Sequence, residues 1–293
     1  RIERIDTEKM KTTLDDGKII IVAGFQGVDI ENSRVTTLGR GGSDLTAVAI
    51  AGALKADLCE IYTDVDGIYT TDPRIEPNAR KLEKISYDEM LELASLGAKV
   101  LQNRSVEMAK KLNVNLVSRS SFTPEVEGTL ITKEENIMEK PIVSGIALDK
   151  NQVRVGMYGV SDKPGIAASI FTSLADENIN VDMIVQTVGV DGKTDLDFTV
   201  PTTDLEATKI VMEKFTNDCV NIDYNDAICK VSIVGVGMKS HTGVASKAFS
   251  ALANNNINIR IISTSEIKIS MIIEEKYSEL AVRSLHDAYN LDK

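Results

Sequence analysis

Apolar and polar positions follow two rhythms in the first half of the chain. Short apolar runs typical of buried strands cover residues 18–23, 56–63 and 114–118. Apolar residues recur with helical spacing over residues 43–54, 86–93 and 100–112. This alternation predicts an α/β layer fold with a mainly parallel sheet. In such sheets the ligand-binding loops follow the carboxyl ends of the strands.

The second half of the chain contains an internal repeat. Residues 165–181 (GIA, then LADENINV) are matched by residues 243–259 (GVA, then LANNNINI). Each copy predicts a strand, a glycine turn, a helix, two strands and a helix, as in a ferredoxin-like βαββαβ unit. Asn178 and Asn256 suit the left-handed conformation that ends a helix. The polar stretch 132–140 separates the two halves and is predicted to be a linker.

Composition narrows the functional classes. With 293 residues and 43% apolar content, the chain can form two or three compact units. Its net charge of -11, without any basic block, argues against a nucleic-acid partner. No apolar run approaches the roughly 20 residues that cross a bilayer, so we expect a cytoplasmic protein with no membrane partner.

Cysteine and histidine are scarce, which limits the possible chemistry. Three cysteines without metal-ligand spacing predict reduced thiols rather than a disulfide framework or a metal site. We interpret His241 as a turn or interface residue and His286 as a surface helix residue. The chemistry is therefore expected to depend on Lys, Arg, Asp and backbone amides.

A glycine-rich segment, TTLGRGGSD at residues 36–44, precedes the helix expected to begin near Leu45. Small residues at a helix N-terminus expose backbone N–H groups that can bind a phosphate or carboxylate. The Arg40 guanidinium can hold a carboxylate through two hydrogen bonds. Ser43 or Asp44 is also expected to cap the helix. Capping alone does not account for three glycines and an arginine, so we favour an anion site.

Three further segments are candidates for ligand contacts. The segment VAGFQG at 22–27 is equally consistent with an ordinary glycine turn. The segment YTDVDGIYTTDPR at 62–74 lacks the later glutamate of a calcium loop, and its Thr, Asp, Tyr and Arg suit a nucleotide. Lys99, in SLGAKV at 95–100, suits either a phosphate contact or a solvated surface position.

Together, VAGFQG, TTLGRGGSD, YTDVDGIYTTDPR, SLGAKVLQNRSVE and the repeat resemble the aspartate kinases of the amino-acid-kinase family, which carry tandem ACT domains. The resemblance implies an α/β fold: the C-terminal part of a three-layer αβα kinase domain, followed by two ferredoxin-like βαββαβ ACT units. It implies a kinase part at 1–135 and a regulatory part at 136–293. The first ACT unit is expected at about 152–216, and the second at about 217–293 plus a strand within 141–150.

The resemblance further implies ATP- and Mg²⁺-dependent conversion of L-aspartate to 4-phospho-L-aspartate, the first step toward lysine, threonine and methionine. It places Thr63, Asp64, Tyr69, Arg74, Lys99 and Val100 at the ATP site. It places Arg40, Gly41, Gly42 and Ser43 around the aspartate carboxylates. Asp44 would organise the catalytic lysine or the bound substrate.

The same resemblance implies feedback control by lysine or threonine, and a homodimer or dimer of dimers formed through the ACT units. In the first unit the implied effector residues are Ser161, Asp162, Gly165, Ile166, Asn180, Val181, Asp182 and Gln186. In the second unit they are Met238, Thr242, Gly243, Val244, Thr264, Ser265 and Glu266. We expect one of the two units to be a working sensor.

Two features of the family pattern do not occur in the sequence. The Lys-Phe/Tyr-Gly-Gly segment, whose lysine stabilises the transferring phosphoryl group, is absent, as is a later substrate-binding glutamate. The sequence resembles a kinase domain without roughly its first hundred residues. We therefore expect no kinase activity from these residues alone. The alternative function is a catalytically silent fragment that senses an amino acid and assembles with another chain.

Overall fold

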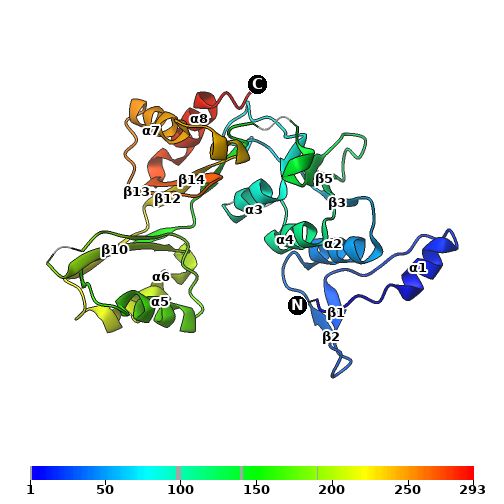
Figure 1. Cartoon of the computed structure of the whole chain (residues 1–293), viewed down its shortest axis with the longest axis horizontal. Helices are drawn as coiled ribbons and strands as arrows, with labels where there is room; N and C mark the ends of the chain where they lie inside the picture. Colours follow the sequence, from blue (N-terminus) through cyan, green and yellow to red (C-terminus); the bar gives the residue numbers. More distant parts are fainter. Residues whose placement is uncertain (1, 97–99, 139–140, 190) are drawn as a thin grey trace. The chain divides into compact units, whose positions relative to one another are not determined.

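The computed structural model describes residues 2–96, 100–138, 141–189 and 191–293 (Figure 1). It divides into two compact units, which are treated separately below. The first comprises Arg1–Ala147, Val234–Thr242 and Tyr289–Lys293. The second comprises Leu148–Ile233 and Gly243–Ala288.

A four-stranded sheet organises the first unit. Its order is β3 (Cys59–Thr63), β5 (Leu116–Ser120), β6 (Thr129–Thr132) and β4 (Lys84–Ser86). The β3–β5 and β4–β6 pairs are parallel, whereas β5 and β6 are antiparallel. The α/β class predicted from the sequence is confirmed, with a mixed sheet. The helices that accompany this sheet are α2 (Gly42–Leu54), α3 (Tyr87–Ser95) and α4 (Asn103–Leu112).

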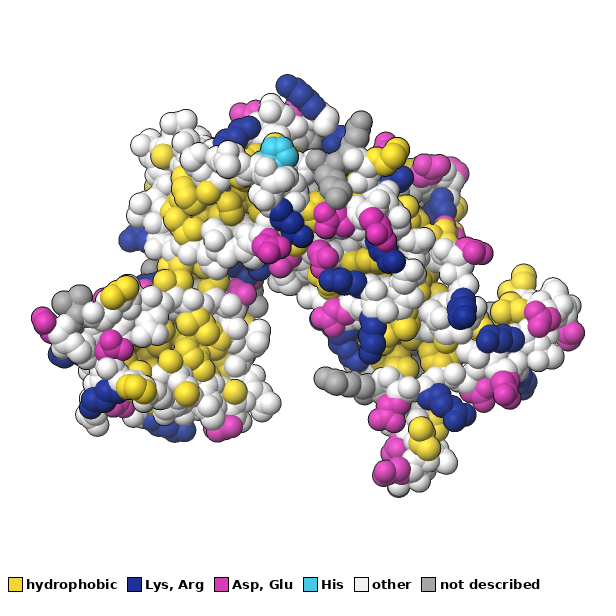
Figure 2. Space-filling view, in the orientation of Figure 1, with side chains coloured by type: hydrophobic (Ala, Val, Ile, Leu, Met, Phe, Trp, Pro, Cys, Tyr) yellow, Lys and Arg dark blue, Asp and Glu magenta, His cyan; other side chains and the backbone are white. Residues whose placement is uncertain are grey.

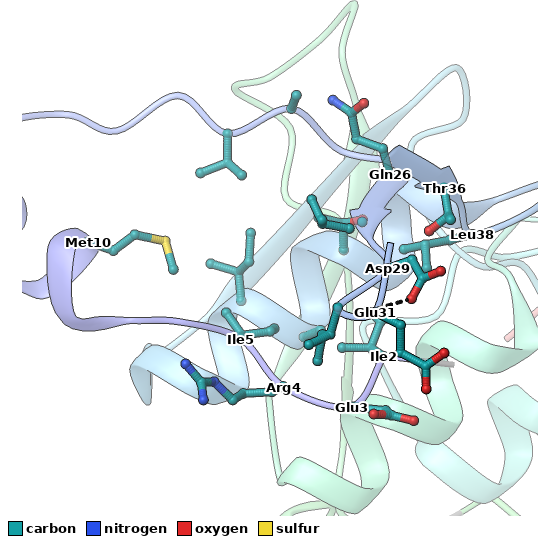
Figure 3. A pocket seen from close by; sticks show the side chains of 18 residues that line it. Ile2, Glu3, Arg4, Ile5, Met10, Gln26, Asp29, Glu31, Thr36 and Leu38 are labelled. Atoms are coloured by element: carbon teal, nitrogen blue, oxygen red, sulfur yellow. Dashed lines mark hydrogen bonds between the residues drawn. The ribbon is translucent and has the colours of Figure 1, made fainter. Parts of the chain in front are cut away.

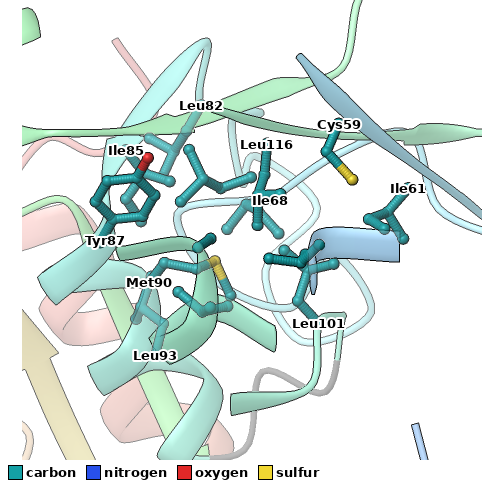
Figure 4. Close-up of a cluster of buried hydrophobic side chains, with 14 of the residues drawn as sticks. Cys59, Ile61, Ile68, Leu82, Ile85, Tyr87, Met90, Leu93, Leu101 and Leu116 are labelled. Atoms are coloured by element: carbon teal, nitrogen blue, oxygen red, sulfur yellow. The ribbon is translucent and has the colours of Figure 1, made fainter. Parts of the chain in front are cut away.

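A single apolar cluster joins this sheet to its helices (Figure 4). Ile61 and Leu116 from the sheet pack with Met90 of α3 and Val106 of α4, and all four side chains are buried. Burial of large aliphatic side chains stabilises the unit by roughly 1.5–3 kcal/mol for each residue. The cluster therefore fixes the positions of the helix N-termini and of the strand ends that lie beside them.

The N-terminal segment differs from the sequence prediction. Residues 18–23 form no strand, and Ile19 and Ile21 are 93% and 96% exposed. An apolar run becomes a buried strand only where a neighbour pairs with its backbone, and the nearby strands β1 (Gln26–Val28) and β2 (Val35–Thr37) pair with each other. The helix α1 (Glu8–Asp15) buries no residue. Figure 2 shows hydrophobic side chains exposed along this segment.

The first ferredoxin-like unit has the sheet order β11 (Asn221–Asn225), β8 (Val153–Ser161), β10 (Lys193–Val200) and β9 (Ile184–Gln186). All three strand pairs are antiparallel. Helices α5 (Ile166–Asp176) and α6 (Leu205–Met212) complete the βαββαβ order. Val155, Phe198 and Leu174 belong to its buried core.

The second ferredoxin-like unit contains β12 (Ile228–Val234), α7 (Val244–Asn254), β13 (Ile261–Thr264), β14 (Lys268–Glu274) and α8 (Ser278–Ala288). Its sheet order is β13-β14-β12-β7, so β7 (Gly145–Asp149) supplies the fourth strand from upstream in the chain. Short 3-10 helices are η1 (Glu134–Asn136), η2 (Thr202–Asp204), η3 (Glu213–Phe215), η4 (Val236–Ser240) and η5 (Glu275–Tyr277).

Two local predictions in the repeat have different outcomes. Asn178 and Asn256 have φ of 57° and 55°, so the left-handed conformation is confirmed, one residue beyond each helix C-cap. The surface position expected for His286 is wrong, because this side chain is only 2% exposed. It lies on the face of α8 that also buries Val282 and Leu285. Among the described residues, no helix combines the length and apolar character needed to span a bilayer.

Candidate functional site

The glycine-rich turn has a geometry that few other residues allow. Gly39 and Gly41 have φ of 82° and 73°, in the left-handed region that favours glycine. A Cβ added to Gly42 would lie 2.8 Å from Cβ of Leu38. The backbone therefore passes closely over its neighbours as it enters α2. Glycines at these positions are required by the turn itself, whether or not a ligand binds there.

The helix that follows the turn has no side-chain cap. Its N-cap residue is Gly41, and α2 begins at Gly42. Capping by Ser43 or Asp44 is therefore wrong, because both residues lie inside the first helical turn rather than before it. Helix N-terminal N–H groups without a side-chain acceptor favour binding of an anion. Arg40 and Ser43 are both exposed beside this terminus.

Asp44 is the only partly buried acidic residue in this turn. Burial raises the pKa of its carboxyl group, and the nearby backbone N–H of Gln102 opposes that shift. Burial raises the pKa of the Cys59 thiol at the start of β3, and the charge of Asp44 raises it further, so the two groups lie close together. Asp44 therefore lies between the glycine turn, β3 and the segment that precedes α4.

The segment 22–27 borders the same helix terminus. The backbone N–H of Phe25 donates to Oγ1 of Thr46 over 3.2 Å, and its carbonyl accepts from the N–H of Leu38 over 2.9 Å. A Cβ at Gly24 would lie 3.5 Å from Cα of Ser43. Although its sequence pattern was ambiguous, this segment lies against the turn.

The loop after β3 holds its polar side chains through local bonds. Oγ1 of Thr63 donates to Oδ1 of Asp64 over 3.0 Å. The hydroxyl of Tyr69 donates to Oδ1 of Asp66 over 3.0 Å. Burial, followed by this hydrogen bond, raises the pKa of Tyr69. These contacts fix both hydroxyls, one at the end of β3 and one in the loop that follows it.

Arg74 ends this loop with an exposed guanidinium. Its Nε and Nη2 donate to the two carboxylate oxygens of Asp72 over 3.0 and 2.7 Å. The guanidinium lowers the pKa of the Asp72 carboxyl group. Because the Arg74 side chain is 89% exposed, it remains accessible to a phosphate despite this pair.

The third predicted nucleotide segment is described only in part. Lys99 lies outside the described residues. Val100 is partly buried, and Leu101, which follows it, is buried in the core. Gln102 is the N-cap residue of α4, yet its side chain does not cap the helix.

Topology brings these segments to one edge of the sheet. Helix α2 precedes β3 and α4 precedes β5, and these two strands are parallel. In such units the helix N-termini lie at the carboxyl edge of the sheet, where the loop after β3 also begins. The turn 38–44, the loop 63–74 and residues 100–102 therefore share this edge.

A cavity of the first unit lies elsewhere. It has a volume of about 540 Å³ and is lined by the N-terminal segment together with Thr46, Ala49 and Ile50 of α2. Figure 3 shows Ile2, Ile5 and Met10 facing this space. None of the predicted substrate or nucleotide residues lines it. Among the described residues, no group of three or more His, Cys, Asp or Glu side chains could hold a metal.

Two polar residues near the turn were not singled out from the sequence. Gln102 and Arg104 donate hydrogen bonds to carbonyl groups of Arg40 and Leu38. Both residues lie within the quoted motif SLGAKVLQNRSVE, but their partners are more than 60 residues away in the chain. Only the fold reveals that the two motifs touch.

The first ferredoxin-like unit has a glycine turn of its own. Gly165, with φ of 98°, is the N-cap of α5, and no side chain caps this helix. The N–H of Asp162 donates to the Gly192 carbonyl over 2.9 Å, and Ser161 ends β8. Ile166 is the first, partly buried residue of α5.

The other candidates of this unit include an engaged carboxylate. Asp182 pairs with Nζ of Lys230, whose side chain is 2% exposed, and Asp149 lies 4.0 Å from the same nitrogen. A ligand ammonium would therefore have to compete with Lys230 for Asp182. Asn180 and Gln186 are exposed, and Val181 is partly buried.

The candidates in the second copy are divided between the compact units. Met238 and Thr242 belong to the first unit, and Gly243 and Val244 to the second. Gly243 has φ of 84° and is the N-cap of α7, again without a side-chain cap. The exposed residue Thr264 ends β13, and the exposed residues Ser265 and Glu266 lie in the turn that leads to β14.

The sequence of this chain matches two protein families and is similar to known proteins along its whole length. Residues 1–117 match the amino acid kinase family, and residues 154–215 and 231–289 match the ACT domain. Aspartokinase of Helicobacter pylori strain J99 is 65% identical over 100% of this chain and 73% of its own length. Aspartate kinase of Pseudomonas putida is 56% identical over 100% of this chain and 71% of its own length.

Solved structures agree with these relatives. E. coli aspartokinase III in complex with aspartate and ADP has a TM-score of 0.80 at 29% identity, covering 96% of this chain. Clostridium acetobutylicum aspartate kinase has a TM-score of 0.83 at 30% identity, covering 91% of this chain. The chain spans 63% and 62% of those two solved chains. With 65% identity to an aspartokinase along its whole length, this chain belongs to the aspartokinase family.

Proposed function

We propose that this chain binds MgATP and L-aspartate at the carboxyl edge of its first sheet and supports formation of 4-phospho-L-aspartate. The observation that carries the proposal is the uncapped N-terminus of α2, with exposed Arg40 and Ser43, on the same edge as the loop 63–74. The 65% identical relative is an aspartokinase, and E. coli aspartokinase III has been solved with aspartate and ADP.

The reaction asks for alignment and charge neutralisation more than for covalent chemistry. Arg40 and the N–H groups of Gly41 and Gly42 suit the substrate carboxylates, and the Ser43 hydroxyl can donate to the same groups. Asp44 would organise the catalytic lysine or the bound substrate. The kinase part is assigned to residues 1–135 and the regulatory part to residues 136–293.

At the nucleotide, Thr63, Asp64 and Tyr69 suit the nucleoside, while Arg74, Lys99 and Val100 suit the phosphates and their surroundings. Kinases commonly bind Mg²⁺ through one or two carboxylates plus substrate phosphates, so we propose a cation that arrives with ATP. Bound in this way, Mg²⁺ neutralises charge on the phosphates. Asp64 or Asp66 would supply a carboxylate.

Calorimetry with L-aspartate and MgATP tests the proposal directly. Arg40→Ala should weaken aspartate binding by about 10- to 100-fold, because a charge-assisted hydrogen bond contributes about 1.5–3 kcal/mol. Arg34→Ala, in the exposed hairpin, is the matched control and should change nothing. A chain that binds neither ligand would refute the proposed function, and equal affinities in both variants would refute the role of Arg40. Trapping the acyl phosphate with hydroxylamine then reports turnover.

We also propose that lysine or threonine regulates the enzyme through its ACT units. The glycine N-caps of α5 and α7 leave both helix N-termini without a side-chain acceptor, which suits an effector carboxylate. E. coli aspartokinase III has been solved with lysine and aspartate. Asp162→Asn should weaken effector binding, whereas Asp176→Asn at the far end of α5 should not. If neither amino acid binds, the sensing role is refuted.

A homodimer or dimer of dimers formed through the ACT units completes the proposal. Edge strand β9 exposes Ile184, and Val188 just beyond it is 91% exposed. An exposed apolar edge strand favours pairing with another chain. Light scattering on the purified chain should therefore give a multiple of the monomer mass, and a monomer at all concentrations would refute this assembly.

A further inference from the structure

Side chains at the start of α4 form hydrogen bonds to the backbone of the glycine turn. Nε2 of Gln102 donates to the carbonyl oxygen of Arg40 over 2.8 Å. Nη1 of Arg104 donates to the carbonyl oxygen of Leu38 over 2.9 Å. A turn with two left-handed glycines has few bonds of its own to fix it. These two side chains therefore select one of the conformations that the glycines allow.

Gln102 contacts or influences the turn at three places. Besides bonding the Arg40 carbonyl, it acts on Asp44, because the backbone N–H of Gln102 lowers the pKa of that carboxyl group. A Cβ placed on Gly41 would lie 2.8 Å from Cγ of Gln102, so the side chain crosses directly over this glycine. One residue thus touches the positions on both sides of the helix N-terminus and the glycine between them.

The Gln102 amide is only half satisfied. Its Oε1 atom is buried and accepts no hydrogen bond from any described residue, while Nε2 is bonded to Arg40. Its side chain does not cap α4, although Gln102 is the N-cap residue. A buried acceptor without a partner does not favour stability. The orientation of this amide is therefore better explained by the turn that it holds than by the helix that it precedes.

The position of Gln102 in the chain links it to the nucleotide. Val100 is two residues earlier, and Leu101 between them is 4% exposed and anchored in the core. A ligand that contacts Val100 therefore contacts the segment 100–102, and the other end of this segment is hydrogen-bonded to the turn. Coupling through this segment requires no rearrangement of the strands of the sheet.

We propose that Gln102 is a positioning residue that fixes the substrate turn and transmits nucleotide binding at residue 100 to aspartate binding at residues 40–44. This proposal rests on the proposed function, because it takes the turn as the aspartate site and residue 100 as a nucleotide contact. It predicts reciprocal tightening of the two ligands.

Gln102→Met is the informative variant. Methionine has nearly the same volume and removes both the donor to Arg40 and the unpartnered acceptor, so folding should be little affected. In calorimetry, aspartate affinity should fall about tenfold, the amount expected for one hydrogen bond. Affinity for a non-hydrolysable MgATP analogue should change less than twofold. In the unsubstituted chain the analogue should increase the affinity for aspartate, and this increase should disappear in Gln102→Met.

Controls separate this inference from the proposed function. Glu107→Gln, exposed on the next turn of α4, should leave every affinity unchanged. If the unsubstituted chain fails to bind aspartate, the proposed function fails and this inference with it. If the unsubstituted chain binds aspartate and Gln102→Met matches it with and without the analogue, only this inference is overturned.

A second variant and a second measurement cover a folding defect. Gln102→Glu keeps the size and polarity of the side chain but cannot donate to Arg40 when ionised, so it should reproduce the aspartate defect. Hydrogen exchange of the amides at residues 39–42 should accelerate in both Gln102 variants and not in Glu107→Gln. Unchanged exchange in both Gln102 variants would refute the claim that Gln102 holds the turn.

Discussion

Replacing Glu89 should destabilise the first unit far more than replacing an exposed acidic residue would. This carboxylate is 2% exposed and accepts four hydrogen bonds. Oε2 accepts from the N–H and hydroxyl of Ser86, over 3.1 and 2.6 Å. Oε1 accepts from the Ser144 hydroxyl over 2.5 Å and the Val236 N–H over 3.0 Å. Glu89 thus joins the start of α3 to two distant segments of the same unit.

The expected loss in free energy of unfolding follows from the donors that Glu89→Ala would leave without an acceptor. The two backbone N–H groups cannot turn toward another acceptor, and each unsatisfied buried donor costs about 1–3 kcal/mol. One of these two donors is the Ser86 N–H, whose bond to Glu89 completes the capping box on α3, so the loss of that box is already counted. We expect a total loss of about 3–5 kcal/mol, or a melting temperature about 10 °C lower for a unit of this size.

Scanning calorimetry on a graded set of variants checks this reasoning. Glu89→Gln keeps one acceptor but turns an NH₂ group toward a backbone N–H in either amide orientation, so its loss should be intermediate. Asp88→Ala, one residue earlier on α3, breaks only a half-exposed ion pair with Lys110 and should cost less than about 1 kcal/mol. If Glu89→Gln is as stable as the unsubstituted chain, or Asp88→Ala loses as much as Glu89→Ala, the explanation is wrong.

Three further outcomes follow from burial and charge. Because burial raises the pKa of Asp44, its ionisation destabilises the folded chain at neutral pH, so Asp44→Asn should be more stable at pH 7 and equal below about pH 4, where both states are protonated. Burial raises the pKa of Cys59 to about 11 and of Cys229 to about 12, so a thiol reagent at pH 8 should label neither before unfolding. Lys230→Ala leaves Asp182 without its buried partner and should lower stability to urea by about 1–3 kcal/mol, and no change in midpoint would contradict the pairing.

Local pattern was sufficient for much of the fold. Helical spacing over residues 43–54 predicted α2, although the helix begins at Gly42 rather than near Leu45 as expected, and the repeat revealed two ferredoxin-like units. It failed for residues 18–23, since apolar character says nothing about whether a neighbouring strand is present to pair. It failed again for His286, because one face of an amphipathic helix can bury a polar ring when aliphatic neighbours surround it.

The residues that hold the site together could not be ranked from sequence. The pattern Ser86-x-x-Glu89 is a capping-box signal and could have marked the start of α3. Its bond to Val236 spans 147 residues, and the bond from Gln102 to Arg40 spans 62. Local periodicity carries no information at these separations. Such contacts become visible only when the strands have brought the helix termini together.

One device recurs at the three helices to which ligands are assigned. Helices α2, α5 and α7 each begin after a left-handed glycine, Gly41, Gly165 or Gly243, and no side chain caps them. Helix α3, to which no ligand is assigned, has a complete capping box instead. A side-chain cap would occupy the N–H groups that an anion needs, whereas glycine satisfies the backbone geometry and leaves them open. Substrate binding and effector sensing would thus use the same local chemistry, and the surrounding side chains, such as Gln102 beside Gly41, would make each terminus selective.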